Sequence, residues 1–83
     1  MTASRNEIFA KLCELLQAFN HNKIELAGTT DISTDLNIDS VSVMDFVMEV
    51  EDHFDIDIPL NVLSETRTID DLTGVVGERL KGK

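Results

Sequence analysis

The sequence predicts an all-α fold, a small bundle of three longer helices and one short helix. Three observations favour this class. Wherever apolar residues recur with a clear period, the period is helical. Only one proline and four glycines occur in the chain, which disfavours a β-sandwich with its many tight turns. A length of 83 residues has room for one domain, so residues 1–83 are expected to fold as a single unit.

The first helix is expected to begin at Ser4 and to end near Asn20–Asn22. Ser4 and Glu7 form the Ser-x-x-Glu pattern of a capping box, in which each side chain binds the backbone amide of the other residue. Apolar residues then follow at helical spacing: Ile8, Leu12, Leu15 and Phe19. Cys13 lies at the edge of this stripe, where we expect a small core side chain and not a reactive thiol.

Residues 21–38 are predicted to form a long loop, because Asn, Gly, Thr and Ser interrupt the helical pattern. Four apolar residues should tie this loop to the core: Leu26, Ile32, Leu36 and Ile38. The second helix is expected to run from Asp39 or Ser40 to about Phe54. Asp39 is a good N-cap, because its carboxylate can accept the free amides of the first helical turn.

The second helix has more apolar surface than one core contact needs. At about 100° per residue, its core side should carry Val43, Phe46, Val47, Val50 and Phe54. An acidic side lies nearly opposite and carries Asp45, Glu49 and Asp52. Between the two sides runs an apolar flank, interrupted by Glu51, that consists of Val41, Met44 and Met48.

The C-terminal third is expected to contain an extended link and two further helices. Residues 55–59 alternate acidic and apolar side chains before Pro59, and without a partner strand they are predicted to be a link. A short helix is expected around Leu60–Ser64. The last helix should begin at Thr68, with two acids in its first turn that the helix dipole favours, and should stop at Gly82. Its buried stripe is Ile69, Leu72, Val76 and Leu80.

The chain is strongly acidic, with 16 acidic and 7 basic residues and a formal net charge of −9. Such a charge repels nucleic-acid phosphates and anionic membranes, so neither is an expected partner. No Lys or Arg occurs between Lys23 and Arg67, a stretch with eleven acids: Glu25, Asp31, Asp35, Asp39, Asp45, Glu49, Glu51, Asp52, Asp55, Asp57 and Glu65. This stretch either serves solubility alone or docks on a basic partner surface.

The sequence does not favour catalysis or export. The two histidines, His21 and His53, fall in a loop and at the polar edge of a helix, and no Ser/His/Asp or Cys/His grouping can be assembled. We therefore do not expect an enzyme, and both histidines are expected to be solvated. The sequence has no secretory signal and no membrane span, and its single cysteine cannot form an internal disulfide. These features predict a cytoplasmic protein.

A calcium loop is also disfavoured. Oxygen-bearing side chains alternate from Asp31 to Asp39, but an EF-hand loop needs Gly at its sixth position and Glu at its twelfth. Counting from Asp31, those positions hold Leu36 and Ser42, and counting from Asp35 the required residues are missing as well. No metal site is predicted.

Ser40 is the most informative position. As the first residue of a helix, its hydroxyl would lie at the positive end of the helix dipole, where a covalently attached phosphate diester is favoured. Two segments around it resemble the acyl carrier proteins, and the likeness extends over nearly the whole chain: Leu36-Asn37-Ile38-Asp39-Ser40-Val41 and Phe54-Asp55-Ile56-Asp57-Ile58-Pro59.

The resemblance implies a four-helix carrier that is not an enzyme. It implies that Ser40 receives 4′-phosphopantetheine from coenzyme A through a phosphopantetheinyl transferase. The thiol of this arm would carry acyl groups as thioesters to acyl-transferring or acyl-modifying enzymes of fatty acid or specialised lipid biosynthesis. The carrier is expected to be a monomer, and its partners are expected to have basic surface patches.

The resemblance and the helix faces together nominate two sets of site residues. Partner contacts are expected at Asp39, Val41, Met44, Asp45, Met48, Glu49, Glu51 and Asp52. A cavity for the acyl chain is expected to be lined by positions that otherwise serve as ordinary core: Phe46, Val47, Val50, Leu63 and Ile69.

Several departures from the family pattern point to a specialised carrier and not to the housekeeping one. They are Asn37 for Gly, Val41 for Leu, Ser42 for an acid and Asp45 for Glu. Two alternatives stay open. One is an aminoacyl or peptidyl carrier domain of a secondary-metabolite pathway, and the other is an acidic interaction domain without a prosthetic group.

Overall fold

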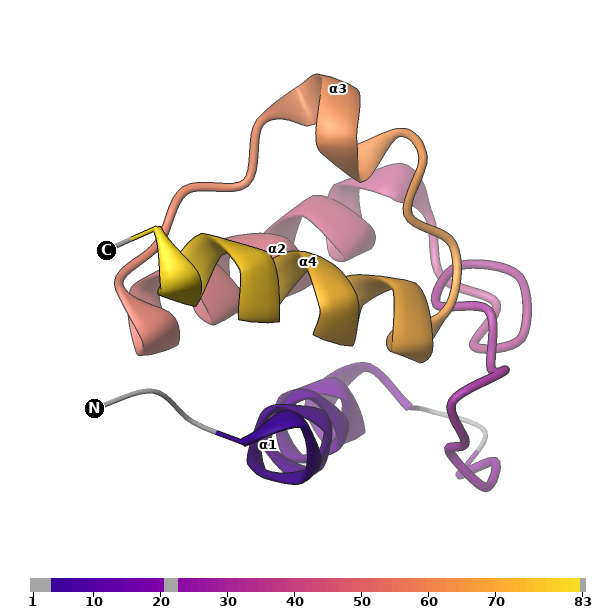
Figure 1. The fold of residues 1–83 in the computed structure, drawn as a ribbon. Coiled ribbons are helices and arrows are strands. Elements are labelled where there is room, and N and C mark those ends of the chain that lie inside the picture. Colours follow the sequence, from indigo (N-terminus) through magenta and orange to yellow (C-terminus); the bar gives the residue numbers. More distant parts are fainter. Residues whose placement is uncertain (1–3, 21–22, 83) are drawn as a thin grey trace.

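The structure, a computed structural model, describes residues 4–20 and 23–82. Its elements in chain order are α1 (Arg5–Leu16), the 3₁₀ helix η1 (Gln17–Phe19), α2 (Ser40–Phe54), α3 (Leu60–Leu63) and α4 (Ile69–Lys81). Figure 1 shows α4 in front of α2, with α1 below them, seen nearly end-on, and α3 above. The predicted bundle of three longer helices and one short helix is confirmed.

α1 begins as expected and ends earlier than expected. The Ser4 hydroxyl accepts from the Glu7 amide at 3.2 Å, and the Glu7 carboxylate accepts from the Ser4 amide at 3.4 Å. The predicted end near residues 20–22 is wrong for the α-helix, which stops at Leu16 and tightens into η1. The buried Asn20 side chain bonds both backbone groups of Ile24, which turns the chain away. His21 and Asn22 lie outside the described residues.

The connection between α1 and α2 is held against the start of α4. The Thr30 carbonyl accepts from the Ile69 amide at 3.1 Å, and the Ile32 amide donates to the Arg67 carbonyl at 2.9 Å. Figure 1 shows this connection along one side of the bundle. The residues predicted to tie it to the core do so, two of them buried and two half-buried: Ile32, Leu36, Leu26 and Ile38.

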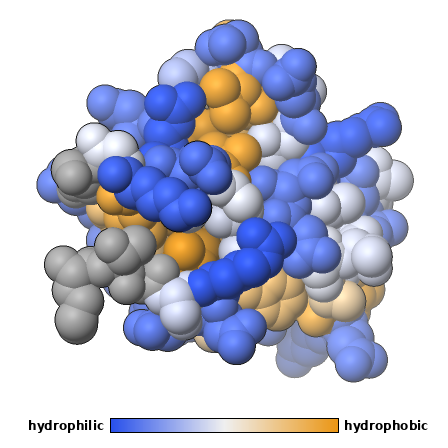
Figure 2. Space-filling model, viewed as in Figure 1, coloured by the Kyte–Doolittle hydropathy of each residue, from blue (hydrophilic) through white to orange (hydrophobic). Residues whose placement is uncertain are grey.

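The core lies between the three longer helices and draws on each of them. Phe46 of α2 is fully buried, and its ring meets that of Phe19 edge-on with centroids 6.1 Å apart. The remaining helical core residues are Ile8, Leu12, Leu16, Val47, Val50, Ile69, Leu72 and Val76. Each large apolar side chain buried in this way contributes about 1.5–3 kcal/mol. On the face seen in Figure 2, hydrophilic residues cover most of the surface and apolar ones show in smaller patches.

The predicted extended link at residues 55–59 is anchored at both ends. Asp55 ends α2 in the left-handed conformation, with φ 55°, which is a common way for a helix to stop. Ile56 and Ile58 are both buried and fasten the link to the core. α3 follows as a single turn with no buried residue. None of the helices in the described part of the chain is long and apolar enough to cross a membrane.

Candidate functional site

The candidate site begins at the N-terminus of α2. Asp39 is the N-cap, and its carboxylate accepts from the Ser42 amide at 2.9 Å. This hydrogen bond is the main cause that lowers the pKa of the Asp39 carboxyl from its ordinary value. Ser40 is the first residue of the helix and is exposed. The predicted cap and helix start are therefore confirmed, and the Ser40 hydroxyl lies exposed at the N-terminus of α2.

The surroundings of Ser40 fit a covalently attached phosphate diester. Within residues 4–20 and 23–82, its hydroxyl makes no hydrogen bond, and the amides of Ser40 and Val41 have no partner. Unpaired amides at a helix start favour a negative group, and the helix dipole adds to this preference. A phosphodiester on this oxygen would thus meet donors without displacing any existing bond. The residues present fit 4′-phosphopantetheine at this position.

Four large apolar side chains of the described chain are exposed, three of them on α2 after Ser40 and one at the start of α3. Val41 is 67% exposed, Met44 41% and Met48 60%, as the helical pattern predicts for the flank of this helix. Leu60, the first residue of α3, is also a large apolar residue on the surface and is 70% exposed. Sequence reasoning did not find Leu60. Its position directly after Pro59, at the start of a one-turn helix, was the available signal.

The predicted acidic side of α2 is exposed and unpaired with cations. Asp45, Glu49 and Asp52 are exposed and border an open groove of about 710 Å³. Three ion pairs form among the described residues, and none involves an acid of α2: Arg5–Asp70, Lys11–Glu14 and Glu78–Lys81. The negative charge of α2 is therefore uncompensated within the described chain.

Glu51 differs from the other acids predicted to contact partners. It is half-buried, and its carboxylate accepts from the Ile58 amide at 2.8 Å. Its side chain thus holds the link that follows α2, while the side chains of Glu49 and Asp52 make no hydrogen bond within the described chain. The sequence pattern, in which Glu51 interrupts the apolar flank, carried no sign of this bond.

The residues nominated for an acyl cavity separate into two groups. Val47 and Leu63 border a cavity of about 230 Å³ between α2, the residues after α3 and the loop before α2. Phe46, Val50 and Ile69 are fully buried in the closed core and do not line it. The rest of the lining is Asp31, Ile32, Ser33, Thr34, Val43, Ser64, Thr66, Arg67 and Leu72. Ligand pockets commonly measure about 300–1,000 Å³, so this cavity suits a short segment of chain.

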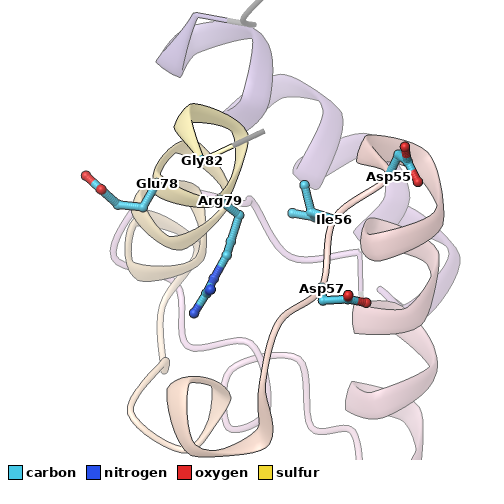
Figure 3. Close-up of a pocket in the computed structure, with 6 residues that line it drawn as sticks. All are labelled: Asp55, Ile56, Asp57, Glu78, Arg79 and Gly82. Atoms are coloured by element: carbon cyan, nitrogen blue, oxygen red, sulfur yellow. The ribbon is translucent and has the colours of Figure 1, made fainter.

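A second groove lies between the link and the end of α4, with a volume of about 350 Å³. Figure 3 shows Arg79 reaching from α4 into the space between α4 and the link, while Glu78 points away from this space and the Asp57 carboxylate points away from Arg79. Its other lining residues are Asp55, Ile56 and Gly82. Its lining residues include one cation, Arg79, and two acids of the link, and they contain no nucleophile with an adjacent base.

Among residues 4–20 and 23–82, the remaining reactive side chains are not arranged as a catalytic or metal centre. His53 is exposed, with its ring edge-on to that of Phe54 at 4.9 Å, and His21 lies outside the described residues. In the part of the chain that the structure describes, no three His, Cys, Asp or Glu side chains are grouped to hold a metal ion. Cys13 is half-buried on α1, and this burial raises the pKa of its thiol.

Comparison with known proteins agrees with this geometry. Residues 6–76 match the family described as "Phosphopantetheine attachment site". A "Probable acyl carrier protein" of Caulobacter vibrioides is 38% identical over 55 residues, 66% of this chain and 64% of that protein. The match thus covers just under two thirds of the length of the Caulobacter protein. An "Acyl carrier protein" of Lactobacillus acidophilus is 28% identical over 74 residues, 88% of this chain and 92% of that protein.

A third relative, an "Acyl carrier protein" of Kocuria rhizophila, is 32% identical over 75 residues. That match covers 89% of this chain and 93% of the relative. The family match runs from α1 into α4 and includes the exposed start of α2. This chain therefore belongs to the acyl carrier protein family, whose members bear 4′-phosphopantetheine and act as carriers and not as enzymes.

Proposed function

We propose that Ser40 carries the 4′-phosphopantetheine arm, and that the chain delivers acyl groups to enzymes of fatty acid or specialised lipid biosynthesis. The observation that carries this proposal is the exposed, unbonded Ser40 hydroxyl at a helix start with two unpaired amides. When bound, the group supplies a thiol that holds acyl chains as thioesters. Asp39 keeps the helix start ordered through its bond to the Ser42 amide.

Neighbouring serines are poorer attachment points. Ser42 is half-buried within the first turn, and its amide is already bound by Asp39. The Ser4 hydroxyl accepts from the Glu7 amide in the capping box of α1. Only Ser40 combines exposure, a free hydroxyl and a preceding acidic cap within the segment that resembles the family motif.

Intact-protein mass spectrometry tests the attachment. Incubation with coenzyme A, magnesium and a phosphopantetheinyl transferase should add one arm to the unmodified protein and none to Ser40→Ala. Ser42→Ala is the matched control and should accept the arm. An arm on Ser40→Ala would defeat the assignment. A protein that never accepts an arm would instead favour the acidic interaction domain without a prosthetic group.

The proposed partner surface combines exposed acids with exposed apolar side chains. Asp45, Glu49 and Asp52 would attract basic patches on the transferase and the acyl-handling enzymes, as would Asp39 beside the arm. The apolar part of the contact consists of Val41, Met44, Met48 and Leu60. Methionine suits a surface that must fit several partners, since its side chain is flexible and polarisable. Glu51 is assigned a different role below.

The cavity bordered by Val43, Val47 and Leu63 is the proposed seat for the beginning of an acyl chain. It lies against α2, and Val43 is three residues on from Ser40. Proton NMR shifts of the Val47 and Leu63 methyls should move when the arm is loaded with a short acyl group. The methyls of Val50, in the closed core, should move less. Equal shifts at all three would indicate a different seat.

The second candidate, an aminoacyl or peptidyl carrier, shares the arm and the fold. The strong negative charge of α2 and the names of the relatives favour acyl cargo. Loading assays with acyl and aminoacyl adenylating enzymes separate the two. We also propose that residues 1–83 form one domain and that the protein is monomeric and cytoplasmic. Size-exclusion chromatography with light scattering tests the monomer.

A further inference from the structure

One residue of α2 binds three successive parts of the link that follows it. The Glu51 carbonyl accepts from the Asp55 amide, which closes α2, and from the Ile56 amide at 3.1 Å. The Glu51 carboxylate accepts from the Ile58 amide at 2.8 Å. A hydrogen bond to a charged, partly buried acceptor is among the stronger ones in proteins. The path of the link is therefore set by Glu51 together with the buried side chains of Ile56 and Ile58.

The helix that follows the link is held to the molecule by packing, because Val62 and Leu63 are half-buried and pack against the core. It has few hydrogen bonds to the rest of the chain. α3 has no buried residue and no side-chain cap. The hydrogen bonds of residues 59–66 stay within that segment, among the described residues. On its C-terminal side, the first bond that leaves the segment is that of Arg67, whose carbonyl accepts from the Ile32 amide. On its N-terminal side, the corresponding bond is the one between Ile58 and Glu51.

We propose that Glu51 is a positioning residue, whose carboxylate holds the Ile58 amide and so fixes α3 beside the cavity bordered by Val47 and Leu63. Two hydrogen bonds flank α3, and Glu51 accepts the one on its N-terminal side. Loss of that bond would loosen the link and α3, which would then be held to α2 and the core by the packing of Ile56, Ile58, Val62 and Leu63 alone. Two side chains of α3 would then become more mobile together: Leu63, which borders the cavity, and Leu60, which is exposed.

This assignment distinguishes Glu51 from the acids around it. Glu49 and Asp52 present their charge to solvent, where a partner can meet it. The Glu51 side chain is half-buried at the edge of the open groove that these two acids border, and one of its carboxylate oxygens accepts from the Ile58 amide. We therefore expect its effect on cargo to pass through α3. The part of the inference that concerns cargo rests on the function proposed above.

Amide hydrogen exchange in the unmodified protein tests the role of this hydrogen bond directly. In Glu51→Ala, the amides of Ile58, Leu63 and Ser64 should exchange about tenfold faster, as expected for the loss of one strong hydrogen bond. Exchange at Leu72 in α4 should change far less. Glu51→Gln keeps an acceptor oxygen and should restore slow exchange. A uniform rise at every site, α4 included, would mean a general loss of stability and would overturn the proposal.

Asp57→Ala is the matched control, because it removes the same charge one residue from Ile58 and Asp57 is exposed. In Asp57→Ala, amide exchange at Leu63 and Ser64 should be as slow as in the unchanged protein. If Asp57→Ala and Glu51→Ala accelerate α3 equally, charge and not the hydrogen bond is responsible, and the proposal fails. Neither measurement depends on an attached arm, so failure of the Ser40 assignment leaves this test valid.

The cargo part is tested on protein that bears a short acyl thioester. Hydroxylamine should cleave the thioester faster in Glu51→Ala than in the unchanged protein, in Glu51→Gln or in Asp57→Ala. Faster exchange at α3 with unchanged cleavage would support the role of the hydrogen bond and contradict the acyl cavity. Unchanged exchange together with unchanged cleavage would overturn the role of Glu51 altogether.

Discussion

Val50 and Met48 stand two residues apart on α2 in opposite environments. Val50 is fully buried between the helices, whereas Met48 is 60% exposed. We expect Val50→Ala to lower the free energy of unfolding by about 1–3 kcal/mol, because it removes two methyl groups from a closed core. Met48→Ala should stay within about 0.5 kcal/mol of the unchanged protein. Urea denaturation followed by circular dichroism measures both, and equal losses would place Met48 in the core.

At the level of single residues, the sequence predicted which side chains of α2 are buried and which are exposed. It did not predict which of them form hydrogen bonds or line the cavity. A helical period separates Val50 from Met48, because position around a helix depends only on spacing. The same period cannot separate Phe46 in the closed core from Val47 at the cavity. It also cannot separate Glu51 from Glu49. Both distinctions depend on the path of the chain beyond Phe54, which no local pattern contains.

At the level of elements, α2 presents two chemically different surfaces that should act on different steps of binding. Charge reversal in Asp45→Lys should slow modification by the transferase about tenfold at low salt, and the loss should shrink as salt rises. Met48→Ala should weaken binding with little salt dependence, because desolvated apolar contacts mainly govern dissociation. Initial rates across a salt series test this.

Glu78→Lys is the control for Asp45→Lys, since it makes the same charge change on α4. Its modification rate should fall much less at low salt. A normal rate for Asp45→Lys at low salt would contradict the proposed acidic surface, whatever the result for Met48→Ala.

The start of α4 contacts Gly28, which lies in the loop between η1 and α2, so closely that Gly28 has no room for a Cβ atom beside the Asp70 carboxylate. The Gly28 carbonyl accepts from the Asp70 amide at 3.0 Å, and a Cβ on Gly28 would collide with the Asp70 carboxylate. Gly28→Ala should therefore lower stability, by less than the about 1–3 kcal/mol of an overpacked core, since Asp70 is exposed. In the Asp70→Ala background the same change should cost little. Additive losses in thermal denaturation would refute the clash.

The ends of helices show how far local signals reach. Ser4, Asp39 and Thr68 were all predictable as helix starts, because each supplies an oxygen for the amides of the following turn. The early end of α1 was not predictable, because the apolar helical spacing continues to Phe19, which lies in η1. The left-handed Asp55 also escaped prediction, because Gly is the usual residue at such a stop.

At the level of the whole molecule, charge is unevenly distributed. The acids of α2 form no ion pair within the described residues, and the three pairs that exist lie on α1 and α4. Added salt should therefore raise the melting temperature, because screening limits repulsion to about 8 Å at physiological ionic strength. Divalent cations should raise it further. A melting temperature that is independent of both would show that these carboxylates do not destabilise the fold.

The half-buried thiol of Cys13 has a consequence for the chemistry of a loaded carrier. A protein that works through a sulfhydryl at the end of a flexible arm risks transferring its cargo to any other sulfur within reach. Only the thiolate form attacks a thioester or a disulfide, and burial raises the pKa of the Cys13 thiol, which disfavours that form. We therefore expect mild alkylating reagents to label the thiol of the proposed arm before they label Cys13.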